Sequence, residues 1–235
     1  MSVDTLWSPM DLSAPPVIRL SQARLSYPTP DGEIEVLSGI DLSVSPGEIV
    51  AVTGPSGSGK SSLIAVIGGL EPLSGGQARV LETDMTAETE RGRTLLRRRD
   101  IGIVFQAYHL VPSMTALQNA ALPLTLAGDP DAQAKAERML ERVGLGHRLT
   151  HRPSALSGGE QQRVAVARAF VAAPRLVLAD EPTGNLDQRT GETVIRTMFD
   201  LARGSGTALL LVTHDPALAD RCDRTLVIEG GRVVT

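Results

Sequence analysis

Apolar residues follow two different rhythms along the chain, and the rhythm changes near residue 48. Before that point, short apolar and β-branched runs within residues 17–44 are separated by turn residues at 28–32 and 46–47, which predicts an antiparallel, β-rich opening. Residues 1–16 are rich in Ser, Pro and Asp and predict a flexible N-terminal tail.

Beyond residue 48, uninterrupted apolar runs alternate with segments of helical period. Strands covered on both faces have such continuous runs, so the alternation predicts an α/β fold built on a mainly parallel sheet with helices on both faces. The predicted strands are 49–52, 77–81, 101–105, 176–179, 208–212 and a closing hairpin of 226–228 with 233–234. The predicted helices are 63–70, 131–143, a segment that follows Gly159 and runs through Phe170, 188–202 and 216–221, whereas Pro112 and Pro123 interrupt the apolar segment 107–127.

A glycine-rich stretch, GPSGSGKSS, lies where a predicted buried strand meets a predicted helix. Its spacing matches a phosphate-binding loop, in which backbone N–H groups surround phosphate oxygens at a positive helix N-terminus. Lys60 would reach the β- and γ-phosphates, and the Ser61 hydroxyl would complete a Mg²⁺ shell. A plain surface turn is the alternative, which the strand and helix context disfavours. The candidate nucleotide-binding residues are Gly54, Pro55, Ser56, Gly57, Ser58, Gly59, Lys60, Ser61 and Ser62.

Polar side chains also follow the predicted strands at the sheet edge that carries this loop. Asp180 and Glu181 follow 176–179, and we assign Asp180 to the metal and Glu181 to orienting or deprotonating the attacking water. His214 follows 208–212 and could contact a γ-phosphate oxygen or the water, although by itself a structural histidine is the better interpretation. Gln106 follows 101–105 and could ligate Mg²⁺ or the water, with a structural role equally supported.

A second loop of small residues opens another predicted helix. Ser157, Gly158 and Gly159 precede the helical pattern that runs through Phe170 and offer a second phosphate site at a helix N-terminus. One nucleotide needs only one such loop. The second therefore suggests that two chains share nucleotides.

Composition narrows the possible partners. The 235 residues carry a net charge of −4, which gives no general reason to expect nucleic-acid binding, and we interpret the basic run at 97–99 as a solvated helix end.

The single cysteine excludes an intrachain disulfide framework and a zinc site built on several thiolates. The N-terminus lacks the pattern of a secretory signal, and no apolar run approaches the roughly 18 residues of a membrane span, so work at a membrane would need another chain to span it.

Together these motifs resemble an ATP-binding cassette ATPase, the motor subunit of ABC transporters, over residues 17–235. The glycine-rich stretch matches the Walker A loop, Gln106 the Q-loop, residues 156–161 the signature, 176–181 the Walker B strand with its glutamate, 184–187 the D-loop and His214 the switch histidine. The resemblance implies a P-loop NTPase (RecA-like) core with an antiparallel β subdomain and a helical signature subdomain at about 107–172. It also implies ATP and Mg²⁺ as ligands, adenine stacking on Tyr27, a nucleotide contact from Asp187, and head-to-tail pairing with a second copy.

Residues 111–119 and 181–187 are similar to the lipoprotein-release, macrolide-export and cell-division cassettes, and residues 144–149 and 220–224 are most like the YbbA type. That group implies a membrane permease with a large extracytoplasmic domain as partner, docking on residues 107–126, at the cytoplasmic face of the inner membrane. An alternative is a regulatory cassette that signals through a membrane partner to control another enzyme. A cassette that acts on ribosomes or DNA is disfavoured, because such relatives usually carry two cassettes or long insertions in one chain.

Overall fold

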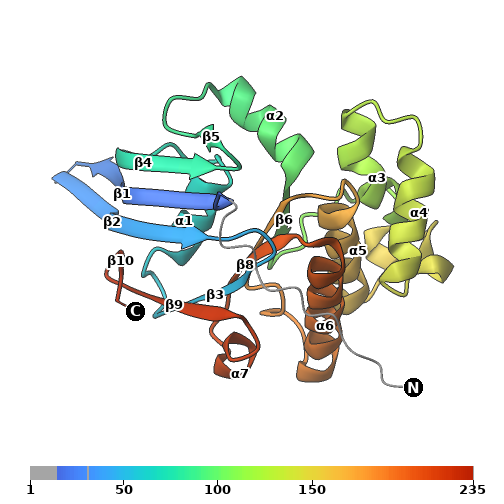
Figure 1. The fold of residues 1–235 in the computed structure, drawn as a ribbon. Helices are drawn as coiled ribbons and strands as arrows, with labels where there is room; N and C mark the ends of the chain where they lie inside the picture. Colours follow the sequence, from blue (N-terminus) through green and yellow to red (C-terminus); the bar gives the residue numbers. More distant parts are fainter. Residues whose placement is uncertain (1–14, 31, 235) are drawn as a thin grey trace, which may run out of the picture.

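The computed structural model describes residues 15–30 and 32–234, so most of the predicted tail lies outside the described residues. Two β-sheets and the helices around them make up the fold (Figure 1). The smaller sheet has the order β2-β1-β4-β5 and is antiparallel, which confirms the predicted β-rich opening. The short strand-like runs predicted within residues 17–44 join into two long strands, with register shifts in their pairing. The strands of this sheet are β1 (Ile18–Thr29), β2 (Gly32–Val44), β4 (Gly75–Val80) and β5 (Thr83–Asp84).

The larger sheet has the order β10-β9-β3-β8-β7-β6 and is parallel except for the β9–β10 hairpin. A mainly parallel sheet was predicted and is confirmed. The pattern of the C-terminal hairpin did not show that β9 also pairs in parallel with β3, which joins the end of the chain to the strand before the glycine-rich loop. The strands are β3 (Ile49–Thr53), β6 (Ile101–Phe105), β7 (Leu176–Asp180), β8 (Ala208–Val212), β9 (Arg224–Glu229) and β10 (Arg232–Val233).

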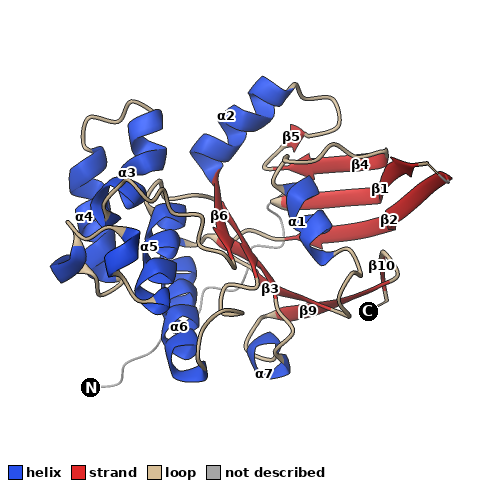
Figure 2. Cartoon of the chain, turned by 180° about the vertical axis from the view of Figure 1, so that it is seen from behind, coloured by secondary structure: helices blue, strands red, loops and turns tan. Residues whose placement is uncertain are grey.

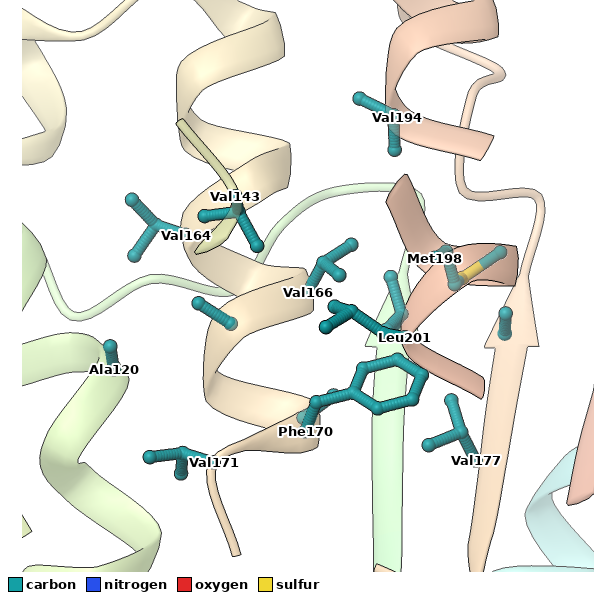
Figure 3. Close-up of a cluster of buried hydrophobic side chains, with 14 of the residues drawn as sticks. Ala120, Val143, Val164, Val166, Phe170, Val171, Val177, Val194, Met198 and Leu201 are labelled. Carbon is teal, nitrogen blue, oxygen red and sulfur yellow. The ribbon is translucent and has the colours of Figure 1, made fainter. Parts of the chain in front are cut away.

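Helices cover both faces of the larger sheet. Successive residues of a strand point to opposite faces, so their side chains enter two different buried clusters. In β7, Leu178 packs in a buried cluster with α1 and the smaller sheet, whereas Val177 packs in a second cluster with α5 and α6 (Figure 3). Helices α1 and α5 therefore lie on opposite faces. The helices are α1 (Lys60–Ile67), α2 (Glu90–Asp100), α3 (Ala116–Leu126), α4 (Ala132–Arg142), α5 (Gly158–Phe170), α6 (Gln188–Ser205) and α7 (Pro216–Ala219), with short 3-10 turns η1 (Gly146–Arg148) and η2 (Pro153–Ala155).

Helices α3, α4 and α5 pack side by side away from the smaller sheet (Figure 2). They lie within the helical subdomain predicted for 107–172, but their buried residues share one cluster with a face of the larger sheet, so that division of the chain stays a prediction. The expectation that Pro123 interrupts this segment was wrong. Pro123 lies inside α3, near its end, where its own carbonyl still accepts the Ala127 N–H at 3.1 Å.

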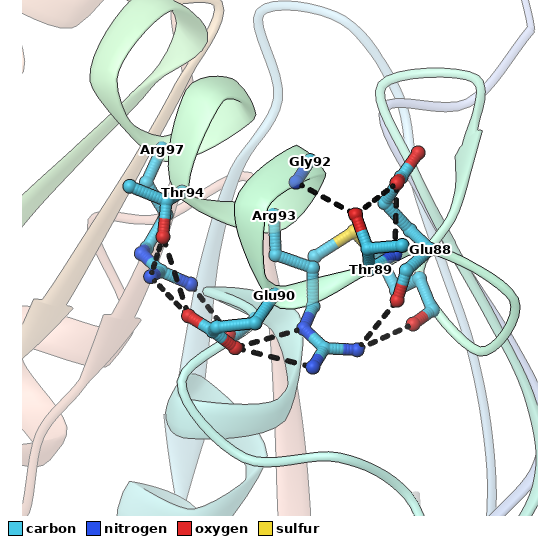
Figure 4. Close-up of polar contacts among 9 residues, drawn as sticks. Glu88, Thr89, Glu90, Gly92, Arg93, Thr94 and Arg97 are labelled. Carbon is cyan, nitrogen blue, oxygen red and sulfur yellow. Dashed lines mark hydrogen bonds and ion pairs between the residues drawn. The ribbon is translucent and has the colours of Figure 1, made fainter.

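The basic run 97–99 forms the last turn of α2, which confirms its interpretation as a helix end. Thr89 caps the helix by accepting the Gly92 N–H at 3.1 Å, and Glu90 pairs with Arg93 at 3.1 Å and Arg97 at 2.8 Å (Figure 4). Cationic side chains at a helix C-terminus are favourable because they offset the helix dipole. Within the described residues, no helix combines the length and the apolar character that crossing a bilayer requires.

Candidate nucleotide site

The glycine-rich loop connects β3 to α1 as predicted, and its shape depends on glycine. Gly54 and Gly59 have φ values of 138° and 102°, in the region that side-chain-bearing residues rarely adopt. A Cβ at Gly54 would overlap the Ile228 carbonyl oxygen, and one at Gly59 would lie 2.8 Å from the Val36 carbonyl oxygen. Helix α1 has no side-chain cap and no acidic residue in its first turn, so its backbone N–H groups face an anion site without a competing acceptor from the cap.

The β9–β10 hairpin contacts this loop through backbone hydrogen bonds. Its turn residue Gly231 donates its N–H to the Ser58 carbonyl at 3.2 Å and accepts the Ser38 N–H at 2.8 Å. Sequence reasoning missed this contact, because the hairpin is more than 170 residues away and its Gly-Gly turn signals only a tight reversal. The phosphate loop is thus held between the smaller sheet and the C-terminal hairpin.

Lys60 is folded over the loop. Its ammonium group donates to the carbonyl oxygens of Gly54 at 2.9 Å and Pro55 at 2.8 Å, and the residue is only 8% exposed. A charge held at the mouth of a glycine loop is positioned to meet phosphate oxygens. The side chain is therefore where the phosphate-loop interpretation expects it.

Asp180 ends β7 beside the first turn of α1. Burial raises the pKa of its carboxyl group, while a hydrogen bond from the Ser61 side chain opposes that rise. Its Oδ1 atom is buried and has no hydrogen-bond partner among the described residues. A carboxylate oxygen with an open coordination position, next to a serine hydroxyl, is a donor set that suits Mg²⁺.

Glu181 and His214 meet at the phosphate loop. Glu181 Oε2 lies 3.6 Å from His214 Nδ1, and both residues line a cavity of about 520 Å³ together with Val36 and phosphate-loop residues. Glu181 has a φ of 44°, a left-handed conformation that is uncommon for a residue with a side chain and that clusters at functional sites. The phosphate-loop residues that line this cavity are Gly54, Ser56, Gly57, Gly59, Lys60, Ser61 and Ser62.

Gln106 does not join this cavity in the described residues. Its side-chain amide donates to Asn185 Oδ1 at 3.2 Å, and its backbone carbonyl oxygen accepts from Asn185 Nδ2 at 3.1 Å. The side chain thus connects the end of β6 to the loop before α6. Its assignment to metal or water stays a prediction, because it requires this amide to turn away from Asn185.

The Ser157 loop begins α5 with a capping box. Ser157 Oγ accepts the Glu160 N–H at 3.3 Å, and Glu160 Oε2 accepts the Ser157 N–H at 2.9 Å. Glu160 Oε1 also pairs with Arg148 at 2.9 Å, and these hydrogen bonds, from Ser157 above all, lower the Glu160 pKa despite partial burial. Since α1 and α5 lie on opposite faces of the sheet, Ser157, Gly158 and Gly159 do not line the cavity around the phosphate loop of their own chain.

The two residues taken from the family resemblance lie at the margins of the site. Asp187 caps α6 by accepting the Thr190 N–H at 3.1 Å, and hydrogen bonds from the Thr190 side chain and backbone lower the Asp187 pKa. Asp187 also lines a groove of about 1040 Å³ that includes Glu181 and His214. Tyr27 lies on β1 and is 40% exposed, with its pKa raised by burial and by nearby Glu71. These positions do not test the predicted adenine stacking on Tyr27 or the predicted nucleotide contact from Asp187.

Gln162 is a buried polar residue beside the site that sequence reasoning missed. It is fully buried in α5, and its amide donates to the carbonyl oxygens of Pro182 at 2.7 Å and Phe105 at 3.3 Å. Its place in the apolar face of a predicted helix is the signal that could have found it, because a polar residue buried there needs partners.

Parallel strands that bring a lysine-bearing phosphate loop and acidic residues to one edge are typical of the P-loop nucleotide hydrolases, and here a histidine joins them. Within that class the chain belongs to the ABC transporter family, whose model matches residues 37–184. It is an ATP-binding, ATP-hydrolysing subunit of the ABC transporter type.

The chain is similar over nearly its whole length to proteins named lipoprotein-releasing system ATP-binding protein LolD. The relative from Alcanivorax borkumensis is 47% identical over 218 residues, which cover 92% of this chain and 96% of the relative. The one from Maricaulis maris is 50% identical over 219 residues, with the same coverage. The predicted resemblance to the lipoprotein-release and YbbA-type group of cassettes is confirmed.

The fold is similar to solved cassette structures. A dimeric post-hydrolysis state of the ATP-binding cassette MJ0796, bound to ADP and Pi, superposes with a TM-score of 0.86 at 33% identity, over 93% of this chain and 97% of that one. A second dimeric structure of MJ0796 matches at 34% identity with the same TM-score. The predicted P-loop NTPase fold is confirmed.

Proposed function

We propose that this chain is the motor subunit of a lipoprotein-releasing type of complex, and that ATP drives two copies together head to tail. The observation that carries the proposal is the separation of the two phosphate-accepting loops on opposite faces of one sheet. A single copy has no means of closing both on one triphosphate, whereas a second copy supplies the missing loop. The names of the relatives support the lipoprotein-releasing part of the proposal, and the dimeric state of MJ0796 supports the pairing of two copies.

In this proposal the residues around the cavity divide the chemistry. Lys60 and the N-terminus of α1 hold the β- and γ-phosphates, and the unpartnered Oδ1 of Asp180 with the Ser61 hydroxyl would hold Mg²⁺. When bound, Mg²⁺ would neutralise negative charge on the phosphates. Glu181 orients and deprotonates the attacking water, and His214 contacts the γ-phosphate side from the next strand. Gln106 would join the metal or the water only after leaving Asn185.

The proposed partner is a permease with a large extracytoplasmic domain, and the proposed location is the cytoplasmic face of the inner membrane. A groove of about 300 Å³ between α2 and α3 suits a cytoplasmic segment of the permease, because apolar side chains and arginines line it together. Leu126 is 59% exposed there, whereas Ala120, Ala121 and Leu124 of the same helix are buried in the core. We infer that the partner presents an amphipathic helix with acidic residues. The groove includes Arg97, Arg98, Arg99, Arg168, Ile103, Leu122 and Leu126.

Complementation between two inactive variants tests head-to-tail pairing. Lys60→Ala removes the cation of the first loop, and Ser157→Asp keeps a good helix cap but places a negative charge where phosphate would lie. Each variant should be inactive alone. Their mixture should regain part of the wild-type ATPase rate, because a mixed pair has one composite site with both loops intact. A mixture that stays as inactive as its components would contradict the shared site.

Reconstitution with the co-purifying membrane protein tests the coupling. We expect ATP to drive release of a lipid-anchored protein from vesicles, and Leu126→Asp to abolish release while the isolated chain keeps its ATPase rate. ATP-dependent activation of a separate enzyme, without release, would instead support the regulatory alternative.

A further inference from the structure

The Gln162 side chain is fixed by two carbonyl groups. Because both of its contacts, Pro182 O at 2.7 Å and Phe105 O at 3.3 Å, are acceptors, the amide nitrogen must face them, and the orientation of the amide is not ambiguous. The residue is 0% exposed, and its Oε1 atom is buried with no partner among the described residues. A fully buried polar side chain that leaves one atom unsatisfied is costly and indicates a role beyond packing.

The two carbonyl groups belong to the turns that carry the candidate chemistry. Phe105 precedes Gln106 at the end of β6, and Pro182 follows Glu181 at the end of β7. The Glu181 N–H donates to Val212 O at 3.1 Å and its carbonyl accepts the Gly184 N–H at 3.0 Å, so the backbone of Glu181 is held from both sides. Gln162 supplies the third anchor, at the residue where the turn leaves the sheet.

The unusual backbone of Glu181 makes these anchors necessary. A φ of 44° is uncommon for a residue with a side chain and persists only where the surroundings enforce it. Without the Gln162 contact at Pro182, the Glu181 backbone can relax toward commoner angles, which would move the Glu181 carboxylate. A displacement of about 1 Å at a reacting group can reduce the rate by roughly a hundredfold.

We propose that Gln162 is a positioning residue for ATP hydrolysis, which holds the Glu181 carboxylate at the phosphate-loop cavity through the Pro182 carbonyl. It does not touch the nucleotide, because its side chain is fully buried. It also lies in the first turns of α5, so the Ser157 loop and the Glu181 turn are joined within one chain. The inference rests on the role of Glu181 given above.

The test replaces the amide without changing its size. Gln162→Met keeps length and apolar volume but donates no hydrogen bond. We expect kcat to fall between about tenfold and a hundredfold while the Kd for ATP, measured by calorimetry, changes less than about twofold. Gln162→Asn has an amide that is one methylene too short to reach both carbonyls, so its kcat should fall less than that of Gln162→Met. This variant replaces Gln162→Met in the test if the Met variant does not fold.

Thr207→Val is the matched control for lost stability. Thr207 is also buried, at 1% exposure, and donates to the Pro174 carbonyl at 2.8 Å, far from the loops of the site. It should lower the melting temperature and leave kcat within about twofold of wild type. A parallel fall of kcat in both variants would overturn the inference, as would a Gln162→Met enzyme with unchanged kcat.

A double variant separates this inference from the assignment of Glu181. If Gln162 acts through Glu181, adding Gln162→Met to Glu181→Gln should cause no further loss of turnover. Multiplied losses would overturn the inference and leave the Glu181 role intact. Full activity of Glu181→Gln alone would instead remove the role of Glu181 itself.

Discussion

The two loops that are predicted to accept phosphate begin helices in different ways. Helix α1 starts from three glycines with positive φ and no side-chain cap, and Lys60 closes over the loop. Helix α5 starts from a capping box in which Glu160 already takes the Ser157 N–H and hydroxyl, and Arg148 neutralises that carboxylate. The first loop therefore offers free donors to an anion, whereas in the second the Ser157 N–H and hydroxyl already bond to Glu160, and a partner's phosphate would have to compete with that carboxylate in the proposed pairing.

Removing the Glu181 carboxylate should have the largest effect. Glu181→Gln keeps an amide of similar size but no general base, so we expect steady-state ATP hydrolysis to fall by roughly 10²- to 10⁴-fold while ATP still binds. If the loops of two copies meet on one nucleotide, scattering should show this variant as a stable dimer in ATP and a monomer without it. Unchanged steady-state hydrolysis would refute the assigned role.

Removing the Lys60 ammonium should weaken the first loop alone. Hydrogen bonds to charged groups contribute about 1.5–3 kcal/mol, so Lys60→Ala should raise the Kd for ATP between about tenfold and a hundredfold in calorimetry. The chain's other lysine gives a control, since Lys135 pairs with Asp129 on the surface and Lys135→Ala should bind ATP normally. Equal weakening in both variants would mean that net charge, not the loop, determines affinity.

Changing the charge beside the second loop should shift pairing in opposite directions. Glu160→Gln keeps the capping box but removes the negative charge, so ATP-dependent dimerisation in a Glu181→Gln background should tighten by about fivefold or less. Arg148→Met leaves the carboxylate unpaired and should weaken dimerisation by a similar factor.

The double variant Arg148→Met with Glu160→Gln should return close to the starting affinity, as sedimentation at several protein concentrations would show. Two single variants that shift dimerisation in the same direction would indicate that the ion pair only stabilises the fold.

The smallest effect concerns stability without nucleotide. Burial raises the Asp180 pKa, so this carboxyl group binds its proton more tightly in the folded protein than in the unfolded chain. The wild-type free energy of unfolding therefore declines as pH rises through the folded pKa. Asp180→Asn removes this penalty and should raise the melting temperature by a few degrees at neutral pH, with a smaller gain in acid, in thermal scans without Mg²⁺. A gain that grows on acidification would contradict a carboxylate whose pKa is raised by burial.

Local patterns predicted much of the fold. Strands β6 and β8 have the predicted bounds, because each is an uninterrupted apolar run between turn or polar residues. Helix α3 was the clearest failure, since Pro123 lies inside the helix, which continues for three residues beyond it. The parallel pairing of β9 with β3 was also missed, because strand neighbours depend on residues far apart in sequence.

The sequence by itself determined the chemistry available to this protein: the phosphate loop with Lys60, the acids after β7 and the histidine after β8 are local patterns whose spacing defines them. Only the tertiary structure decided their geometry. It placed the helices that follow the two candidate phosphate loops on opposite faces of one sheet, turned Gln106 toward Asn185 and buried Gln162 against the Pro182 carbonyl. The physical reason is that periodicity reports which face of an element is buried, whereas the packing of distant elements selects what that face contacts.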